Sequence, residues 1–213
     1  MEKILENYRH IKSQIAPYNP KIIAVTKYFD ESQIIKYYEM GFRDFGENRV
    51  KDAIEKIEKL PDEIIQNSKF HLIGHLQTNK IKWAVGFFNL IHSVDSKKLA
   101  SEISKKASEL GVKQKILIQV NNSGEEQKYG IAPSQLEEMI DYISALKNIE
   151  LLGLMNVAPL TNDEQTLRKL FSEMYKLKEA YNLKELSMGM SNDYKIALDC
   201  GATIVRLGRI LFE

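Results

Sequence analysis

The feature that most constrains this chain is an alternation between short apolar runs, rich in β-forming residues, and longer segments with helical periodicity. Strands that alternate with helices are typical of a parallel sheet with its helices outside. Eight such runs in 213 residues predict one domain, 1–213, with the α/β fold of a (β/α)8 TIM barrel, whose lower size limit is about 200 residues. The runs are IIAVTK (22–27), FRDFG (42–46), KFHLIG (69–74), LIHSV (90–94), KILIQVN (115–121), LLGLMNV (151–157), ELSMG (185–189) and TIVRLG (203–208).

The segments between the runs carry helix start signals. Asp30 followed by Gln33 resembles a capping box, as does Thr161 followed by Glu164. Pro133 stands where the first residue of a helix is expected. The clearest predicted helices are 31–40, 47–59, 97–110, 134–146 and 163–180.

An extra helix is predicted at the N-terminus, over 2–16, because its apolar residues share one helical face. Only seven helices are expected to follow strands, so this helix would fill the vacant place in the ring. The alternative is an open doubly wound sheet, which would need both of its edges covered.

Composition limits the classes of partner. With 28% charged residues and a net charge of +1, the chain has no basic excess of the kind that nucleic-acid binding needs. The sequence contains neither a signal-peptide pattern nor an apolar run long enough for a membrane span. A single cysteine, Cys200, excludes an internal disulfide and fits a reducing compartment. We therefore expect a cytoplasmic protein without nucleic-acid or membrane partners.

A phosphate site is predicted where strands seven and eight end, because barrels frequently bind phosphate with the loops after these strands. Gly189 permits a tight turn, and Ser191 is expected to cap a helix over 192–199. Gly208 allows backbone N–H groups after strand eight to reach the same anion. Lys27 ends strand one, which is the neighbour of strand eight in a closed barrel.

A lysine beside a phosphate site suggests two classes of ligand. One is a sugar phosphate that forms a transient Schiff base, and the other is pyridoxal 5'-phosphate (PLP), which forms a resting one. Arg206 could lower the pKa of the lysine, or it could face the pyridine nitrogen of PLP. A structural role for Arg206, paired with a strand-end carboxylate, is the third possibility.

Other polar residues have simpler interpretations. His71 and His75 are four residues apart but lack a helical HExxH pattern, so zinc binding is not expected. Asn48 follows strand two and either lies near the ligand or caps the next helix. The polar stretch 121–130 is either a lid over the barrel mouth or a solvated loop.

Taken together, the motifs identify a resemblance to the PLP homeostasis protein family, also called the YggS/PROSC family, whose fold is that of the alanine racemase N-terminal domain. The resemblance runs from strand one to strand eight, and LSMGMS with VRLG is its most specific part. The matching segments are AVTK (24–27), FGENRVKD (45–52), FHLIGHLQTNK (70–80), IHSVDS (91–96), ILIQVNNSGEEQKYGI (116–131), LLGLMNVAP (151–159), LSMGMSND (186–193) and TIVRLGRILF (203–212).

The resemblance implies a monomeric barrel that binds, buffers or delivers PLP, held as a Schiff base on Lys27. It implies Arg206 opposite the pyridine nitrogen and Asn48 near the cofactor. It also implies phosphate contacts from Ser191, from the backbone near Met190, and from Gly208 and Arg209. PLP-dependent apo-enzymes and amino acids are the further partners that it suggests.

Two positions depart from the family pattern. Tyr28 begins a Tyr-Phe-Asp stretch where many relatives have a sequence like Thr-Lys-Pro, and Arg209 stands where a small residue is common. Alanine racemase itself carries a second, β-rich domain that supplies a catalytic tyrosine, and the 213 residues contain no counterpart. We therefore expect no enzymatic turnover. A weak PLP-dependent racemase and an aldolase-type barrel that uses Lys27 transiently are the alternatives.

Overall fold

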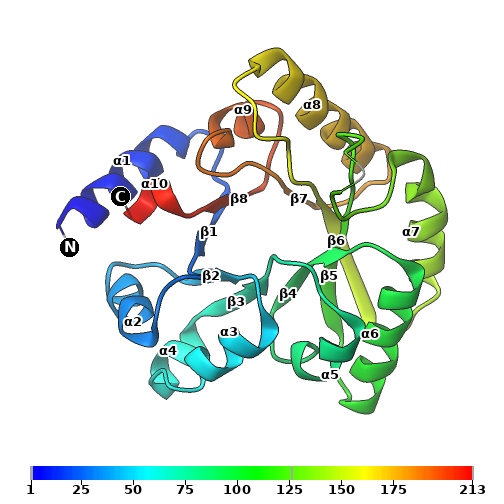
Figure 1. Cartoon of the computed structure of the whole chain (residues 1–213), viewed down its shortest axis with the longest axis horizontal. Coiled ribbons are helices and arrows are strands. Elements are labelled where there is room, and N and C mark those ends of the chain that lie inside the picture. The colour runs from blue at the N-terminus through cyan, green and yellow to red at the C-terminus, as the bar shows by residue number, and fades with distance from the viewer. Residues whose placement is uncertain (1, 126, 213) are drawn as a thin grey trace.

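A computed structural model describes residues 2–125 and 127–212. Its strands form one closed parallel barrel in sequence order, with the last strand beside the first (Figure 1). The predicted (β/α)8 barrel is therefore confirmed, and the open sheet is excluded. The strands are β1 Lys21–Val25, β2 Asp44–Glu47, β3 Lys69–Leu72, β4 Leu90–Val94, β5 Gln114–Gln119, β6 Ile149–Met155, β7 Glu185–Ser187 and β8 Ile204–Leu207.

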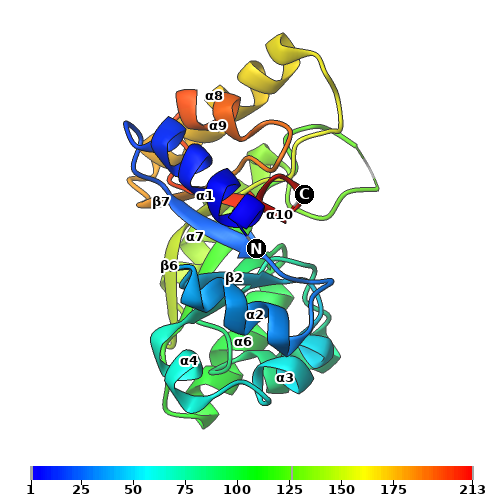
Figure 2. The same cartoon turned by 90° about the vertical axis from the view of Figure 1, so that its left-hand side faces the viewer.

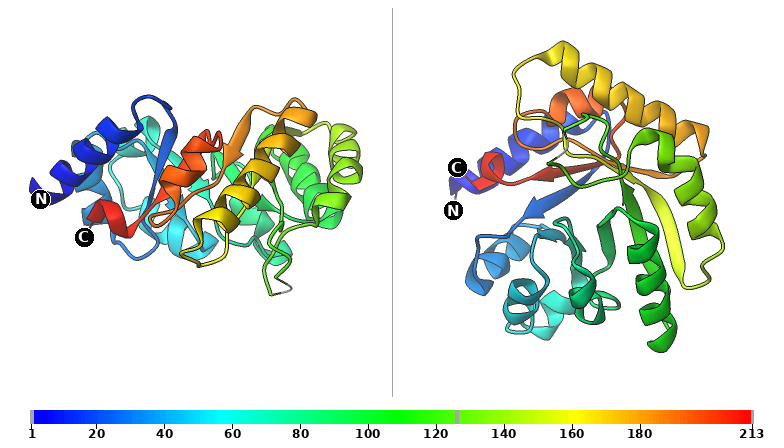
Figure 3. Two further views of the ribbon diagram at one scale, coloured as in Figure 1. Left: turned by 90° about the horizontal axis from the view of Figure 1, so that it is seen from above. Right: turned by 45° about the vertical axis from the view of Figure 1, so that its right-hand side comes forward.

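The helices surround this barrel (Figure 1), and the right-hand view of Figure 3 shows the green to gold helices on its outer side. The predicted helices are present, with ends that move by up to three residues, whereas α4 and α5 were missed because they are only 6 and 4 residues long. The helices are α1 Glu2–Ile15, α2 Glu31–Glu39, α3 Val50–Ile57, α4 Asp62–Asn67, α5 Ile81–Ala84, α6 Lys97–Glu109, α7 Leu136–Ser144, α8 Glu164–Ala180, α9 Tyr194–Asp199 and α10 Arg209–Phe212; the 3-10 turns are η1 Thr78–Lys80 and η2 Pro133–Gln135.

Two of the three predicted start signals are confirmed. Asp30 and Gln33 form a reciprocal capping box at the start of α2. Pro133 is the first residue of η2, which leads into α7. The prediction for Thr161 is wrong, because α8 is capped by Asp163, whose carboxylate accepts from the backbone N–H of Gln165 at 3.0 Å.

The N-terminal helix α1 lies beside α10, next to β1 and β8 (Figures 1 and 2). A helix therefore does follow β8, although it is a single turn, and α1 shares the place that was expected to be vacant. The apolar face of α1 is buried at Ile11 and Ile15. No helix of the described chain is long and apolar enough to cross a bilayer.

Six strands end one or two residues earlier than predicted, and the ends of β1 and β7 position polar residues. After β1 the chain turns at Thr26, whose carbonyl accepts from the N–H of Phe29 at 2.9 Å, so Lys27 lies in the turn and not on the strand. After β7 the chain turns at Gly189, where φ is +88°. A Cβ atom at Gly189 would lie 2.6 Å from the Cβ of Ala197, so the close approach of α9 also requires glycine.

Candidate functional site

Arg206 is the most firmly held polar residue of the barrel interior. It lies on β8 and is 4% exposed. Its Nη1 donates to the carbonyl and the Oγ of Ser187, at 2.8 and 2.7 Å, and its Nη2 donates to the carbonyl of Asn156 at 2.7 Å. These bonds join the ends of β6, β7 and β8. The predicted alternative of an ion pair with a carboxylate is not seen for Arg206 within the described residues.

The guanidinium of Arg206 stays charged at neutral pH and keeps spare donors. Burial lowers the pKa of Arg206 to about 10, and the carboxylate of Asp193 acts in the opposite direction. A guanidinium carries five N–H groups. The three bonds above leave two of them with no partner in the described part of the chain.

A buried chain of hydrogen bonds, which the sequence analysis missed, continues from Ser187 across the barrel. Ser187 Oγ lies 3.0 Å from Nδ1 of His92, and Nε2 of His92 lies 3.1 Å from Nδ1 of His71. Nε2 of His71 lies 3.0 Å from the carboxylate of Asp44, at the start of β2. Burial lowers the pKa of His71 and lowers that of His92 well below its usual value, with His71 and Arg206 adding to the effect at His92. The polar histidines inside the apolar runs of β3 and β4 were the available signal.

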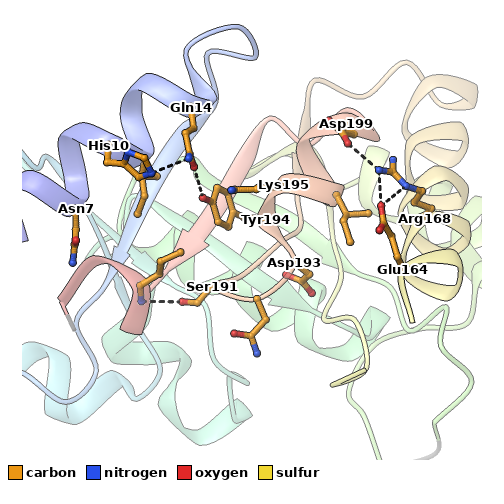
Figure 4. Close-up of a pocket in the computed structure, with 14 residues that line it drawn as sticks. Asn7, His10, Gln14, Glu164, Arg168, Ser191, Asp193, Tyr194, Lys195 and Asp199 are labelled. Atoms are coloured by element: carbon orange, nitrogen blue, oxygen red, sulfur yellow. Dashed lines mark hydrogen bonds and ion pairs between the residues drawn. The ribbon is translucent and has the colours of Figure 1, made fainter. Parts of the chain in front are cut away.

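Ser191 and the turn after β8 are brought together, but not in the predicted way. Ser191 does not cap a helix over 192–199, because α9 begins at Tyr194 after Asp193. Its Oγ instead lies 3.4 Å from the backbone N of Gly208 and 3.5 Å from that of Ile210, at the start of α10 (Figure 4).

The N–H of Met190, another predicted contact, already has a partner. It donates to the carboxylate of Asp193 at 2.5 Å, while the carbonyl of Met190 accepts from the N–H groups of Asp193 and Tyr194. Residues 190–193 therefore form a closed turn, which explains why the helix starts later than predicted. Burial raises the pKa of Asp193, and the Met190 N–H and the charge of Arg206 lower it. The raising effect of burial is the larger one, so the pKa of this carboxyl beside the predicted anion site lies above its usual value.

Gly208 and Arg209 have open surroundings. A Cβ atom at Gly208 would meet only Val25, at an ordinary 3.6 Å. Arg209 is exposed and makes no ion pair within the described residues. Both are therefore accessible to a ligand above the start of α10.

Lys27 lies next to this turn but its side chain points elsewhere. Ala24 of β1 is opposite Leu207 of β8, so the turns that follow the two strands are neighbours. Lys27 is exposed, and its Nζ lies 4.8 Å from the centre of the exposed Tyr28 ring. The lysine is therefore an exposed residue beside the turn after β8, and the contact of its Nζ is with the Tyr28 ring.

Asn48 lies at another part of the mouth, after β2. It does not cap α3, since Arg49 occupies that position. Its backbone carbonyl approaches Gly74 so closely that a Cβ atom there would be 2.3 Å from the oxygen. The structure thus places Asn48 on the β2–β3 side, whereas Ser191, Arg206 and Gly208 cluster on the β7–β8 side.

The segment 121–130 reaches the mouth through Tyr129, whose ring stacks on His75 with 3.8 Å between ring centres. Nδ1 of His75 lies 3.4 Å from Asp95, whose pKa is raised by burial. The contact at 3.4 Å is an ion-pair distance without hydrogen-bond geometry. His75 therefore lies at the mouth, against the segment 121–130. The described residues hold no cluster of three or more His, Cys, Asp or Glu suited to a metal ion.

A pocket of about 590 Å³ opens beside the Ser191 turn, between α1, α8, α9 and α10 (Figure 4). Ser191 and Ile210 line its edge, while the described residues that line it include neither Lys27 nor Arg206. Arg168 in this pocket is already paired with Glu164 and Asp199. The pocket therefore reaches the Ser191 turn from the surface. The charge of its arginine, Arg168, is already balanced by the two carboxylates.

Comparison with known proteins gives consistent matches over the whole length. A family model described as alanine racemase, N-terminal domain, matches residues 1–213. A pyridoxal phosphate homeostasis protein of Aquifex aeolicus is 40% identical over 198 residues, which cover 90% of this chain and 86% of that protein. PipY of Synechococcus elongatus, solved without PLP, is 37% identical with a TM-score of 0.91 and covers 99% of this chain and 100% of its own. The same protein solved with PLP bound is 36% identical with a TM-score of 0.87, over 99% of this chain and 100% of its own.

Proposed function

The chain belongs to the pyridoxal phosphate homeostasis protein family, and from this premise we propose that it binds PLP, with Lys27 as the Schiff-base lysine, and buffers or delivers this cofactor in the cell. The observation that carries the proposal is the convergence, at the end of β7 and β8, of a buried cation with spare donors and a cluster of backbone N–H groups. This convergence lies beside the turn that bears the exposed lysine.

The phosphate of PLP fits the start of α10. The backbone N–H groups of Gly208 and Ile210 both point to Ser191 Oγ, and Arg209 beside them is exposed. Free N–H groups at the start of a helix favour an anion. In this arrangement the phosphate would take over the N–H groups that now donate to Ser191 at 3.4–3.5 Å, which are long bonds.

The pyridine nitrogen of PLP fits Arg206. The guanidinium is held by three bonds, and its two unused N–H groups are donors for a ring acceptor. Because the pKa of Arg206 is about 10, the guanidinium keeps its protons at neutral pH, and a nitrogen opposite it stays unprotonated. An unprotonated ring withdraws electrons weakly, so this arrangement favours holding the cofactor over turnover.

Lys27 supplies the reactive amine. When bound, PLP contributes an aldehyde carbon, to which an amine can bond with loss of water. Within the described residues Lys27 is exposed and contacts the Tyr28 ring without a hydrogen bond or ion pair, and in this proposal its Nζ turns from that ring to the cofactor and back. Reversible attachment of this kind suits delivery to PLP-dependent apo-enzymes or exchange with amino acids.

We further propose that the protein is a cytoplasmic monomer without enzymatic turnover. The names of the related proteins, which describe homeostasis, support the absence of turnover. The alternative of a weak racemase is tested directly with L-amino acids and purified protein. A racemase or decarboxylase rate of about 1 s⁻¹ or more, as in ordinary enzymes, would contradict this part of the proposal.

The test of PLP binding compares the wild type with Lys27→Ala. We expect the wild type to be yellow, with borohydride reduction followed by peptide mapping labelling Lys27. We expect Lys27→Ala to bind PLP without a covalent bond, and pyridoxal, which lacks the phosphate, to bind either protein far more weakly. Labelling of another lysine would contradict the assignment of Lys27, and equal affinity for PLP and pyridoxal would contradict the phosphate site.

A further inference from the structure

A buried ionic cluster lies directly beneath the turn that carries Lys27. Lys56 of α3 and Glu47 of β2 form an ion pair of 2.6 Å, with side chains that are 9% and 2% exposed. Of the ion pairs in the described part of the chain, this is the one in which both side chains are less than 10% exposed. Its position, and not only its presence, therefore needs an explanation.

The pair is bonded to Thr26, the residue immediately before Lys27. Lys56 Nζ donates to the carbonyl of Thr26 at 2.8 Å, and Thr26 Oγ1 donates to Oε1 of Glu47 at 2.6 Å. The backbone N–H of Thr26 donates to the carbonyl of Gly46 at 3.0 Å. All three polar atoms of this buried threonine are thus fixed.

Stability alone is a weak reason for such a cluster, because well-packed apolar residues of similar size often stabilise a core as well as a buried ion pair does. What an apolar pair cannot do is hold a backbone carbonyl. Lys27 is exposed and has no hydrogen bond or ion pair of its own in the described residues, so the only restraint on its amine beyond the Tyr28 contact is the position of its backbone.

We propose that Thr26, Glu47 and Lys56 are positioning residues that hold the backbone of Lys27 where its amine meets a bound aldehyde. The proposal rests on the proposed function of Lys27. Bond formation between a bound aldehyde and an amine depends on keeping the two in reacting geometry, and a displacement of about 1 Å can reduce it by about a hundredfold. The cluster does not touch the Ser191 turn, so it acts on covalent attachment and not on phosphate binding.

The test separates covalent attachment from binding with two ligands. PLP reports the covalent bond through its absorbance band and through labelling after borohydride reduction. Pyridoxine 5'-phosphate has the same ring and phosphate but no aldehyde, so its affinity reports binding alone. For Lys56→Met we expect the rate of covalent attachment to fall about tenfold or more, with the affinity for pyridoxine 5'-phosphate unchanged within about threefold.

Three further variants keep the test independent of folding defects. Thr26→Val keeps the ion pair and removes only the hydroxyl, and we expect a fall of about threefold in the attachment rate. Lys56→Arg preserves a donor for both partners and should retain at least half of the rate. Lys178→Met is the matched control, because Lys178 on α8 is also mostly buried, at 14% exposure, and is paired with Glu179; its attachment rate should equal that of the wild type.

The outcomes distinguish the two proposals. If the wild type attaches PLP to Lys27 but Lys56→Met and Thr26→Val attach it at the rate of Lys178→Met, the positioning role is wrong and the proposed function stands. A parallel loss of affinity for pyridoxine 5'-phosphate in Lys56→Met and Thr26→Val would also overturn it, since the cluster would then be a general structural support. If the wild type attaches no PLP, both proposals are overturned.

Discussion

Arg206 lies on β8 and Lys27 follows the neighbouring strand β1, yet the surroundings of these two basic side chains are opposite. Arg206 on β8 is 4% exposed and donates three hydrogen bonds to Ser187 and Asn156. Lys27 follows β1 in an exposed turn, and its Nζ lies over the Tyr28 ring with no hydrogen bond or ion pair to any described residue. The side chain of Arg206 is thus part of the core, whereas that of Lys27 is exposed at the barrel mouth.

The difference follows from where each residue stands relative to its strand. A residue within a barrel strand has a fixed direction and finds partners on strands whose register is also fixed. Inside the barrel, hydrogen bonds are stronger and an unmade one is more costly than in water. A side chain beyond the strand end has neither the fixed direction nor the fixed neighbours that the strand register provides. The side of the mouth that carries Arg206 (the fixed side) is therefore suited to recognition of a ligand. The side that carries Lys27 (the free side) is suited to a group that forms a covalent bond and releases it again.

The largest expected effect is on the fixed side. Arg206→Met leaves the carbonyl of Asn156 without its donor and removes one of the two donors of the Ser187 carbonyl, which keeps the N–H of Asn156 at 3.2 Å. A buried unpaired acceptor loses about 1–3 kcal/mol, and each further hydrogen bond that is lost costs about 0.5–1.5 kcal/mol. We expect the free energy of unfolding to fall by roughly 3 kcal/mol, measured by urea denaturation. Arg209→Met is the control, since this exposed arginine should contribute less than about 0.5 kcal/mol. Equal losses of stability in the two variants would show that the hydrogen bonds of Arg206 contribute no more to the fold than exposed Arg209 does.

The next effect is a loss of stability in acid, carried by the histidine chain behind Arg206. Burial holds the pKa of His92 well below its usual value. In the unfolded chain this histidine binds a proton near pH 6.5, whereas in the folded chain it stays neutral at that pH. The unfolded state therefore binds more protons as pH falls, and stability that is present above pH 6.5 is lost below it. For this one group we expect a fall of about 2 kcal/mol between pH 8 and pH 5.

His92→Gln isolates this contribution, because glutamine keeps a neutral hydrogen-bonding side chain and does not titrate. Denaturation of both proteins at several pH values gives the difference directly. We expect the variant to have the shallower dependence on pH. If the unfolding free energies of the two proteins fall in parallel with pH, then His92 accepts a proton in the folded state. The buried histidine chain behind Arg206 would then be accessible to protons and not rigidly closed.

A smaller effect is expected at Ser191, which lies in the turn after β7 and contacts the start of α10. Ser191→Ala removes the hydroxyl that the N–H groups of Gly208 and Ile210 now share. We expect PLP to bind about tenfold more weakly, equivalent to about 1.4 kcal/mol, by equilibrium titration. Pyridoxal, which has no phosphate, should bind wild type and variant alike. A similar loss for both ligands would mean that Ser191 supports the fold and not the phosphate.

The smallest effect is expected on the free side. Tyr28→Ala removes the ring that Lys27 contacts at 4.8 Å, and an exposed cation–π contact contributes about 0.5–1 kcal/mol. Releasing the amine should speed covalent attachment of PLP to Lys27 by about twofold to fivefold. Tyr28→Phe, which keeps the ring, should behave as the wild type. A slower rate in Tyr28→Ala would show that the ring orients Lys27 toward the ligand, which would contradict the view that the Lys27 side chain is unrestrained.

Part of the site was predictable because strand ends are visible in the sequence. Lys27, Arg206 and Gly208 were placed at the mouth from periodicity and the barrel rule alone. The start of α9 was not, because Ser191 and Asp193 are both good helix caps and the choice between them depends on contacts elsewhere. Ser191 instead meets the N–H groups of residues 17 and 19 positions away.

The order of strands and helices and the closed barrel could be predicted from the sequence, since these depend on local periodicity and on turns between neighbours in the chain, whereas most strand ends lie one or two residues from their predicted positions. Only the tertiary structure decided which partner each polar group meets. Lys56 meets the carbonyl of Thr26 from 30 residues away, and His92 meets Ser187 from 95 residues away. Such partners lie on different strands and helices, so their meeting depends on the register and closure of the whole barrel, which no local pattern records.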